Sequence, residues 1–204
     1  MAAWDRPPAD ITAARFFEEW LPGAFAASGR PGLAGPPTVR VTLSGAGGGA
    51  WEVRAGEDGM EVCAPSPTSG PPDVWLRQSA ADFRAAFAGD PDLPDLLPPG
   101  WSALDLLFLD PRDVELLRQV HGRVLVEVSG RRRRRWAFDV AFGKTGVGAG
   151  RPSSTIRLDA ATFDGLRRRT LPPMQPLVDG RLKIDGDRAL AMQLLLLLAN
   201  RLAR

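Results

Sequence analysis

The chain has 204 residues, a length that suits one large or two small globular domains. Its single cysteine, Cys63, excludes an internal disulfide, and one Cys with one His, His121, are too few side chains to hold a structural zinc ion. Residues 1–102 have 7 basic and 13 acidic side chains whereas residues 103–204 have 19 and 11, so an anionic surface would attract the second half.

A helix is predicted near the N-terminus. Asp10 is a favourable N-cap, and the helix should reach about Trp20 with Phe16, Phe17 and Trp20 on one face. The residues before it lack the basic and apolar regions of a signal peptide, so we expect a cytoplasmic protein.

A β-hairpin and a capped helix are predicted next. Val39–Gly45 alternates apolar and polar side chains, which indicates a strand with one buried face, and a short glycine-rich tip leads to Trp51 on the second strand. Trp75–Ser79 is again strand-like. Ser79 can cap a following helix that carries Phe83.

The middle of the chain is rich in proline. Residues 65–72 and 90–100 are predicted loops, the second with one helical turn. Leu104–Leu109 is predicted to be a strand, and Asp110 to cap a helix that begins at Pro111 and reaches Val120.

These elements then recur at a spacing of first 85 and later 80 residues. The matching features are Val124–Gly130, Trp136, Thr155–Asp159 with the cap Asp159, Phe163, Gly180, the strand Leu182–Ile184 and a final apolar helix capped by Asp187. The sequence therefore predicts two related units, residues 10–109 and 110–204, each reading helix, hairpin, strand, short helices, strand, helix. The alternative is a chance similarity between two hairpins.

The second unit contains the sequence motif Gly180-Arg-Leu-Lys-Ile-Asp-Gly-Asp187 before its last helix. With the preceding strand, capped helix and hairpin, this part resembles the sterol carrier protein type 2 family over residues 120–198. The resemblance implies an α+β fold, with a mainly antiparallel sheet covered by helices and an apolar tunnel for sterols, fatty acyl chains or isoprenoid lipids. The first unit lacks this motif and has Gly100-Trp-Ser-Ala-Leu-Asp-Leu-Leu107 at the corresponding place. We therefore expect two tandem copies of which the first is degenerate.

The tunnel implied by the resemblance would be lined by apolar residues of the second unit. A lipid tail is stabilised there by about 0.8 kcal/mol per buried CH₂ group. The same residues could instead form an ordinary packed core. The predicted lining residues are Trp136, Phe138, Val140, Phe142, Ile156, Leu158, Phe163, Met174, Leu177, Leu182, Ile184, Met192 and Leu195.

Five consecutive arginines, Arg131, Arg132, Arg133, Arg134 and Arg135, form the tip of the second hairpin. Peripheral docking on an anionic membrane is one interpretation, since each cation near such a surface contributes about 1 kcal/mol. The other is a solvated turn. Nucleic acid is not an expected partner, because no aromatic side chains alternate with the arginines.

Catalytic and nucleotide motifs are not supported. Gly143-Lys-Thr145 lacks the glycine that a phosphate-binding loop has five residues earlier, where Phe138 stands. His121 is expected at a helix end, and Asp185 and Asp187 are better explained as turn and cap residues than as an acid–base pair. We therefore expect no enzymatic activity, no cofactor and no metal.

The predicted function is non-enzymatic binding or transfer of a lipid with an apolar tail. Two alternatives stay open. The apolar last helix could bind a protein partner or a second copy of the chain, giving a ligand-free interaction module or homodimer. The protein could also be an accessory factor for an enzyme of lipid or quinone biosynthesis. Its most apolar segment, residues 189–199, is about half the length needed to span a bilayer.

Overall fold

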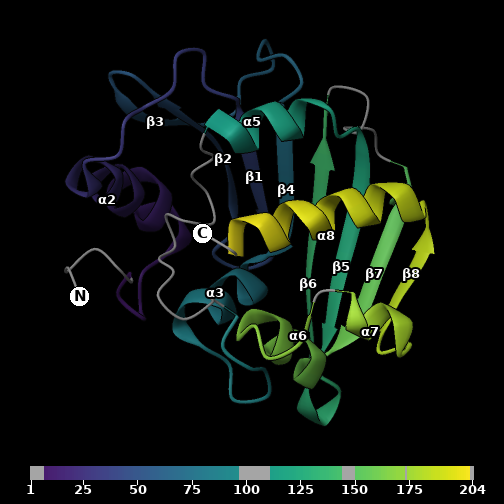
Figure 1. Cartoon of the computed structure of the whole chain (residues 1–204). Coiled ribbons are helices and arrows are strands. Elements are labelled where there is room, and N and C mark those ends of the chain that lie inside the picture. Colours follow the sequence, from purple (N-terminus) through teal and green to yellow (C-terminus); the bar gives the residue numbers. More distant parts are fainter. Residues whose placement is uncertain (1–6, 97–110, 144–149, 173, 203–204) are drawn as a thin grey trace.

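The computed structural model describes residues 7–96, 111–143, 150–172 and 174–202, and Figure 1 shows one curved sheet with helices packed against it. The strands of this part follow the order β3-β2-β1-β4-β6-β5-β7-β8. They are β1 (Val39–Ser44), β2 (Gly49–Gly56), β3 (Gly59–Cys63), β4 (Val74–Ser79), β5 (Gly122–Ser129), β6 (Arg135–Phe142), β7 (Ser154–Asp159) and β8 (Leu182–Gly186). The helical segments are α1 (Ala13–Arg15), the π-helical η1 (Phe16–Trp20), α2 (Leu21–Ser28), α3 (Ala80–Ala88), α5 (Pro111–Arg118), the 3-10 turn η2 (Arg131–Arg133), α6 (Ala160–Arg167), α7 (Gln175–Val178) and α8 (Arg188–Leu202).

The first helix runs without a break through α1, η1 and α2. Its N-cap is Thr12, whose hydroxyl accepts a hydrogen bond at 3.2 Å from the backbone N–H three residues on, so the prediction of Asp10 as the cap is wrong. The predicted end near Trp20 is also wrong, because the helix continues to Ser28. A proline usually ends a helix since its ring meets the carbonyl four residues back, but the π-helical turn just before Pro22 widens the helix there.

Three other predicted caps are confirmed. The Ser79 hydroxyl accepts from the backbone N–H of Asp82 at 3.0 Å, and Asp159 accepts from that of Thr162 at 2.7 Å. The Asp187 carboxylate accepts from a backbone N–H in the first turn of α8 at 3.1 Å. These side chains fix where α3, α6 and α8 leave the sheet.

The sheet is mainly antiparallel, as predicted. Two pairs are parallel, β1 with β4 and β5 with β7. In the first pair Ser44 lies opposite Ser79, and in the second Ser129 lies opposite Asp159. Because the internal sequence match aligns Ser44 with Ser129 and Ser79 with Asp159, the two parallel pairs have the same register. The two hairpins differ in register by two residues.

That hairpin difference is visible at the tryptophans. Trp51 lies opposite Val41, whereas Trp136 lies opposite Val128. At a spacing of 85 residues Val128 corresponds to Leu43 rather than to Val41.

The two halves of the chain are joined by an antiparallel pairing that the sequence did not predict. β4 of the first half pairs with β6 of the second, with Leu76 opposite Val140. Strand β3 was also not predicted. The predicted strand at residues 104–109 and the predicted cap Asp110 lie outside the described residues.

Candidate functional site

The apolar strand residues predicted to line a lipid site point to one face of the sheet. Residues opposite each other on paired strands share a face, so the strand registers define rows that cross β6, β5, β7 and β8. The first row is Trp136, Val128, Leu158 and Leu182; the middle row is Phe138, Val126, Ile156 and Ile184; the third row is Val140, Val124, Ser154 and Gly186.

Helices cover this face from two ends. α6 lies over the first row, where the ring centroids of Phe163 and Trp136 are 6.2 Å apart. α8 packs near the third row, because a Cβ atom added to Gly122 at the start of β5 would stand 2.6 Å from Cδ2 of Leu190. Figure 1 shows α6 and α7 at one end of the strands and α8 crossing them nearer the other.

The middle row is only partly covered. Val126 and Ile156 are buried, but Phe138 and Ile184, at the two ends of the row, stay half-buried although they face the helices. The helices around the row also present half-buried apolar side chains, namely Phe163 and Leu166 from α6, Leu177 from α7, and Met192 and Leu195 from α8. The middle row and these helix residues together are called the apolar site below.

The predicted lining residues thus divide by burial. Trp136, Val140, Phe142, Ile156, Leu158 and Leu182 are buried, and Phe138, Phe163, Leu177, Ile184, Met192 and Leu195 are half-buried. Met174 differs from the rest because 45% of it is exposed at the surface next to α7. Two exposed apolar residues were not predicted, Val178 at 79% on α7 and Leu196 at 53% on α8.

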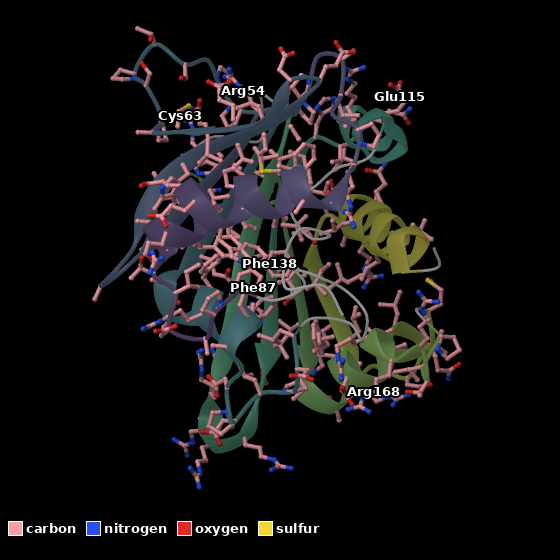
Figure 2. The ribbon with its side chains drawn as sticks, turned by 90° about the vertical axis from the view of Figure 1, so that its left-hand side faces the viewer. Arg54, Cys63, Phe87, Glu115, Phe138 and Arg168 are labelled. Carbon is pink, nitrogen blue, oxygen red and sulfur yellow. The ribbon has the colours of Figure 1, made fainter. Side chains whose placement is uncertain are left out.

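The corresponding face in the first half is filled by aromatic rings. The helix that spans residues 13–28 contributes Phe17, which stacks on Trp51 of β2 at 4.7 Å, and Phe16, which meets Phe83 of α3 at 5.1 Å. Both helix phenylalanines are fully buried. Figure 2 shows Phe87 of α3 and Phe138 of β6 in the layer between sheet and helices.

The arginines of the hairpin tip, Arg131–Arg135, are not equivalent. The Arg134 guanidinium donates a hydrogen bond to the Asp90 carboxylate at 2.9 Å and forms an ion pair with the Asp82 carboxylate at 2.7 Å, both in the first half of the chain. Its hydrogen bond is the main reason why the pKa of Asp90 lies below the ordinary value. Burial alone would lower the pKa of Arg134, but the hydrogen bonds to Asp90 and Asp82 outweigh burial and raise it.

The backbone of the tip is held in place by the same neighbours. The Arg131 N–H donates to the Asp92 carbonyl at 2.8 Å, and the Gly130 N–H closes the turn on the Arg134 carbonyl at 2.7 Å. This contact with residues 82–92 was not predicted. The opposite net charges of the two halves and the acidic loop at residues 90–95 were the available signal.

Two tip residues have a left-handed backbone. Arg132 has a φ of 49° and Arg133 a φ of 62°, a region that costs a residue with a side chain about 1 kcal/mol or more. In the first hairpin the positive φ values belong to Gly45 and Gly47, which have no Cβ atom and adopt them without a steric clash.

The opposite face of the sheet is polar and carries ion pairs across the strands. The Asp139 carboxylate on β6 accepts from Arg77 of β4 at 3.4 Å and from Arg123 of β5 at 2.8 Å, so it bridges the two halves. Arg77 also stands 4.6 Å from the centroid of the Trp75 ring, and the indole N–H of Trp75 donates to Thr42 at 2.9 Å. These side chains neutralise one another rather than forming a charged site.

Two common kinds of feature are absent from the described residues. No three His, Cys, Asp or Glu side chains in residues 7–96, 111–143, 150–172 and 174–202 gather as metal ligands would. Within the same ranges no helix has the length and apolarity that a bilayer-crossing segment needs.

Comparison with known proteins places one region in a family. The model of the SCP-2 sterol transfer family matches residues 104–199. Over 84 residues the chain is 31% identical to hydroxysteroid dehydrogenase-like protein 2 of Xenopus tropicalis, a match that covers 39% of this chain but only 20% of that protein.

Solved structures give similar partial matches. The sterol carrier protein domain 2 of Helicoverpa armigera matches with 22% identity and a TM-score of 0.36, covering 47% of this chain and 78% of the other. Sterol carrier protein 2 from Yarrowia lipolytica matches with 17% identity and a TM-score of 0.34, covering 47% and 83%. The family match over residues 104–199 confirms the predicted resemblance of this part of the chain to the sterol carrier proteins.

Proposed function

We propose that the chain binds a lipid by burying its apolar tail at the apolar site of the second half. The observation that carries the proposal is the incomplete cover of the middle row within a region of the SCP-2 family. Phe138 and Ile184 keep exposed apolar surface that a tail would remove from water, at about 25 cal/mol per Å². The half-buried helix residues would adapt around it, since Met192 and Leu195 are flexible and unbranched at Cβ.

We also propose that the first half is a degenerate copy of the second and does not bind lipid. The equal register of the two parallel strand pairs supports a common origin. The aromatic rings of Phe16, Phe17 and Trp51 occupy the space that the tail would take in the second half. The first half would then serve as a support. The binding needs no covalent chemistry, and we propose a carrier rather than an enzyme.

The test is lipid content and lipid exchange. Purified protein is extracted with organic solvent for mass spectrometry, and binding of a fluorescent fatty acid is titrated. We expect co-purified lipid, or saturable binding that unlabelled fatty acid reverses. Protein that carries no lipid and binds no fluorescent fatty acid would refute the proposal.

A pair of matched variants locates the site. Ile184→Asp places a charge on edge strand β8 in the middle row, and Val62→Asp places one on edge strand β3, also half-buried and facing the helices. A buried carboxylate next to a tail is strongly unfavourable. We expect Ile184→Asp to weaken fatty acid binding at least about 10-fold and Val62→Asp to leave it near wild type. Equal effects would contradict the assignment to the second half.

A further inference from the structure

We propose that the arginine tip, Arg131–Arg135, docks the protein on an anionic lipid bilayer. The inference rests on the proposed function only in that a bilayer is where a tail would be collected or released. Its own basis is the geometry and charge of the tip.

The tip presents free positive charge. Arg131, Arg133 and Arg135 are exposed, and no ion pair to them occurs among the described residues. The Arg132 side chain is 86% exposed, and within the described part of the chain the one carboxylate that it reaches is that of Asp92, at 3.9 Å. Arginines without a close carboxylate partner are available to lipid phosphate and carboxylate groups.

Contacts with the first half hold the backbone of the tip in place. Arg134 is fastened to Asp82 and Asp90, and the backbone of Arg131 is bonded to Asp92. A turn whose backbone is already held in place loses less conformational entropy when it binds a surface.

The arginines are not needed to make the turn. The first hairpin turns with glycine at its positive-φ positions, Gly45 and Gly47. Arg132 and Arg133 adopt the same region against the preference of any residue with a Cβ atom. Strain of this kind is characteristic of positions kept for function rather than for folding.

The surroundings favour a bilayer over a nucleic acid. Figure 1 shows the tip at the same end of the molecule as α6 and α7. Figure 2 shows Arg168, which is paired with Asp164 at 2.9 Å, at that end too. Met174 and Val178 expose apolar side chains there, as peripheral membrane proteins do. The described surface has no exposed aromatic ring on which a base could stack.

The experiment measures flotation of the full chain with vesicles of phosphatidylcholine alone or with 30 mol% phosphatidylserine. The test variant is Arg131→Gln/Arg133→Gln/Arg135→Gln. Its matched control, Arg15→Gln/Arg118→Gln/Arg151→Gln, changes the net charge equally at exposed arginines outside the tip. We expect wild type to bind only the anionic vesicles, the test variant to bind roughly 100-fold more weakly, and the control to stay within a few-fold of wild type.

Further readouts decide the interpretation. Lysine at the same three positions should restore binding, and high salt should abolish it. Equal loss in test and control variants, or no binding of wild type to anionic vesicles, would overturn the proposal. So would single-stranded RNA that binds tighter than the vesicles and is lost with the same three arginines.

Fatty acid binding in solution separates this inference from the proposed function. Unchanged fatty acid affinity of the test variant, together with lost vesicle binding, supports docking as a distinct property. If wild type floats with anionic vesicles but binds no fatty acid, docking stands and the proposed function fails.

Discussion

Arg134 binds two carboxylates of the first half of the chain, and its removal would leave them without their cation. We expect Arg134→Ala to lower the free energy of unfolding by about 2 kcal/mol, because hydrogen bonds to charged, partly buried groups contribute roughly that much. This corresponds to a fall in Tm of roughly 4–8 °C for a chain of this length. Thermal unfolding followed by circular dichroism measures it. Arg135→Ala, at an exposed neighbour, is the control and should change Tm by less than about 2 °C.

The same contact predicts a dependence on pH. The hydrogen bond from Arg134 holds the pKa of Asp90 below its ordinary value of about 3.9. A carboxyl whose folded-state pKa is depressed adds stability above its unfolded pKa and loses it as the pH falls through the folded pKa. Wild type should therefore lose stability more steeply below about pH 4 than Asp90→Asn does. Urea unfolding at several pH values between 3 and 6 tests this, and parallel curves would refute it.

Arg132 and Arg133 offer a test of backbone strain. Glycine has no Cβ atom to clash at positive φ, so Arg132→Gly and Arg133→Gly should each raise the free energy of unfolding, by up to about 1 kcal/mol. Chemical denaturation provides the measurement. Arg131→Gly serves as a comparison, because Arg131 has no positive φ and glycine there brings only entropy cost. A loss of stability at both left-handed positions would show that the tip is not strained.

Among the elements, α8 presents two leucines in opposite environments. Leu194 is buried against the sheet, and Leu196 is 53% exposed. We expect Leu194→Ala to cost about 2–4 kcal/mol of unfolding free energy and Leu196→Ala less than about 1 kcal/mol. Urea denaturation at two protein concentrations checks both. A concentration-dependent loss with Leu196→Ala would instead reveal that Leu196 is covered in a dimer.

How far the elements follow from the sequence depends on how local their causes are. Ser79, Asp159 and Asp187 were predicted as caps, because a cap bonds a backbone group three residues away. The predicted helix end near Trp20 is wrong because the π-helical turn carries the helix past Pro22, and a π-helical turn has no simple sequence signal. Strand β3 was missed because it is short and depends on pairing with β2.

At the scale of the whole molecule, the long-range contacts could not be predicted. The resemblance of the second half to the sterol carrier proteins was predicted and is confirmed by the family match, since the motif from Gly180 to Asp187 is continuous in the sequence. The pairing of β4 with β6 and the ion pairs of Arg134 join residues that are distant in the chain. The apolar site was predicted as a set of residues. Its unequal burial depends on how α6, α7 and α8 pack, which a list of apolar positions does not contain.

The continuous sheet predicts how the protein unfolds. β4 and β6 share a hydrogen-bonded ladder, and Asp139 links both halves by ion pairs, so neither half can open without exposing the other. We expect a single transition in urea. The chain has six tryptophans, among them Trp51 in the first half and Trp136 in the second, and the transitions seen by tryptophan fluorescence and far-UV circular dichroism should coincide. Two resolved transitions would contradict the coupling.

The ladder between β4 and β6 also bears on how such a protein can evolve. A strand with a neighbour on each side has no edge left to offer, so residues 111–202 moved alone into another gene would carry β6 with its outer edge unpaired. Such an unpaired edge can form hydrogen bonds with a strand of another chain and so promote aggregation. A side chain that replaces Leu76 on β4 must in turn pack against Val140, which lies opposite it on β6. The two halves are therefore expected to be inherited together, even if only one of them carries the ligand.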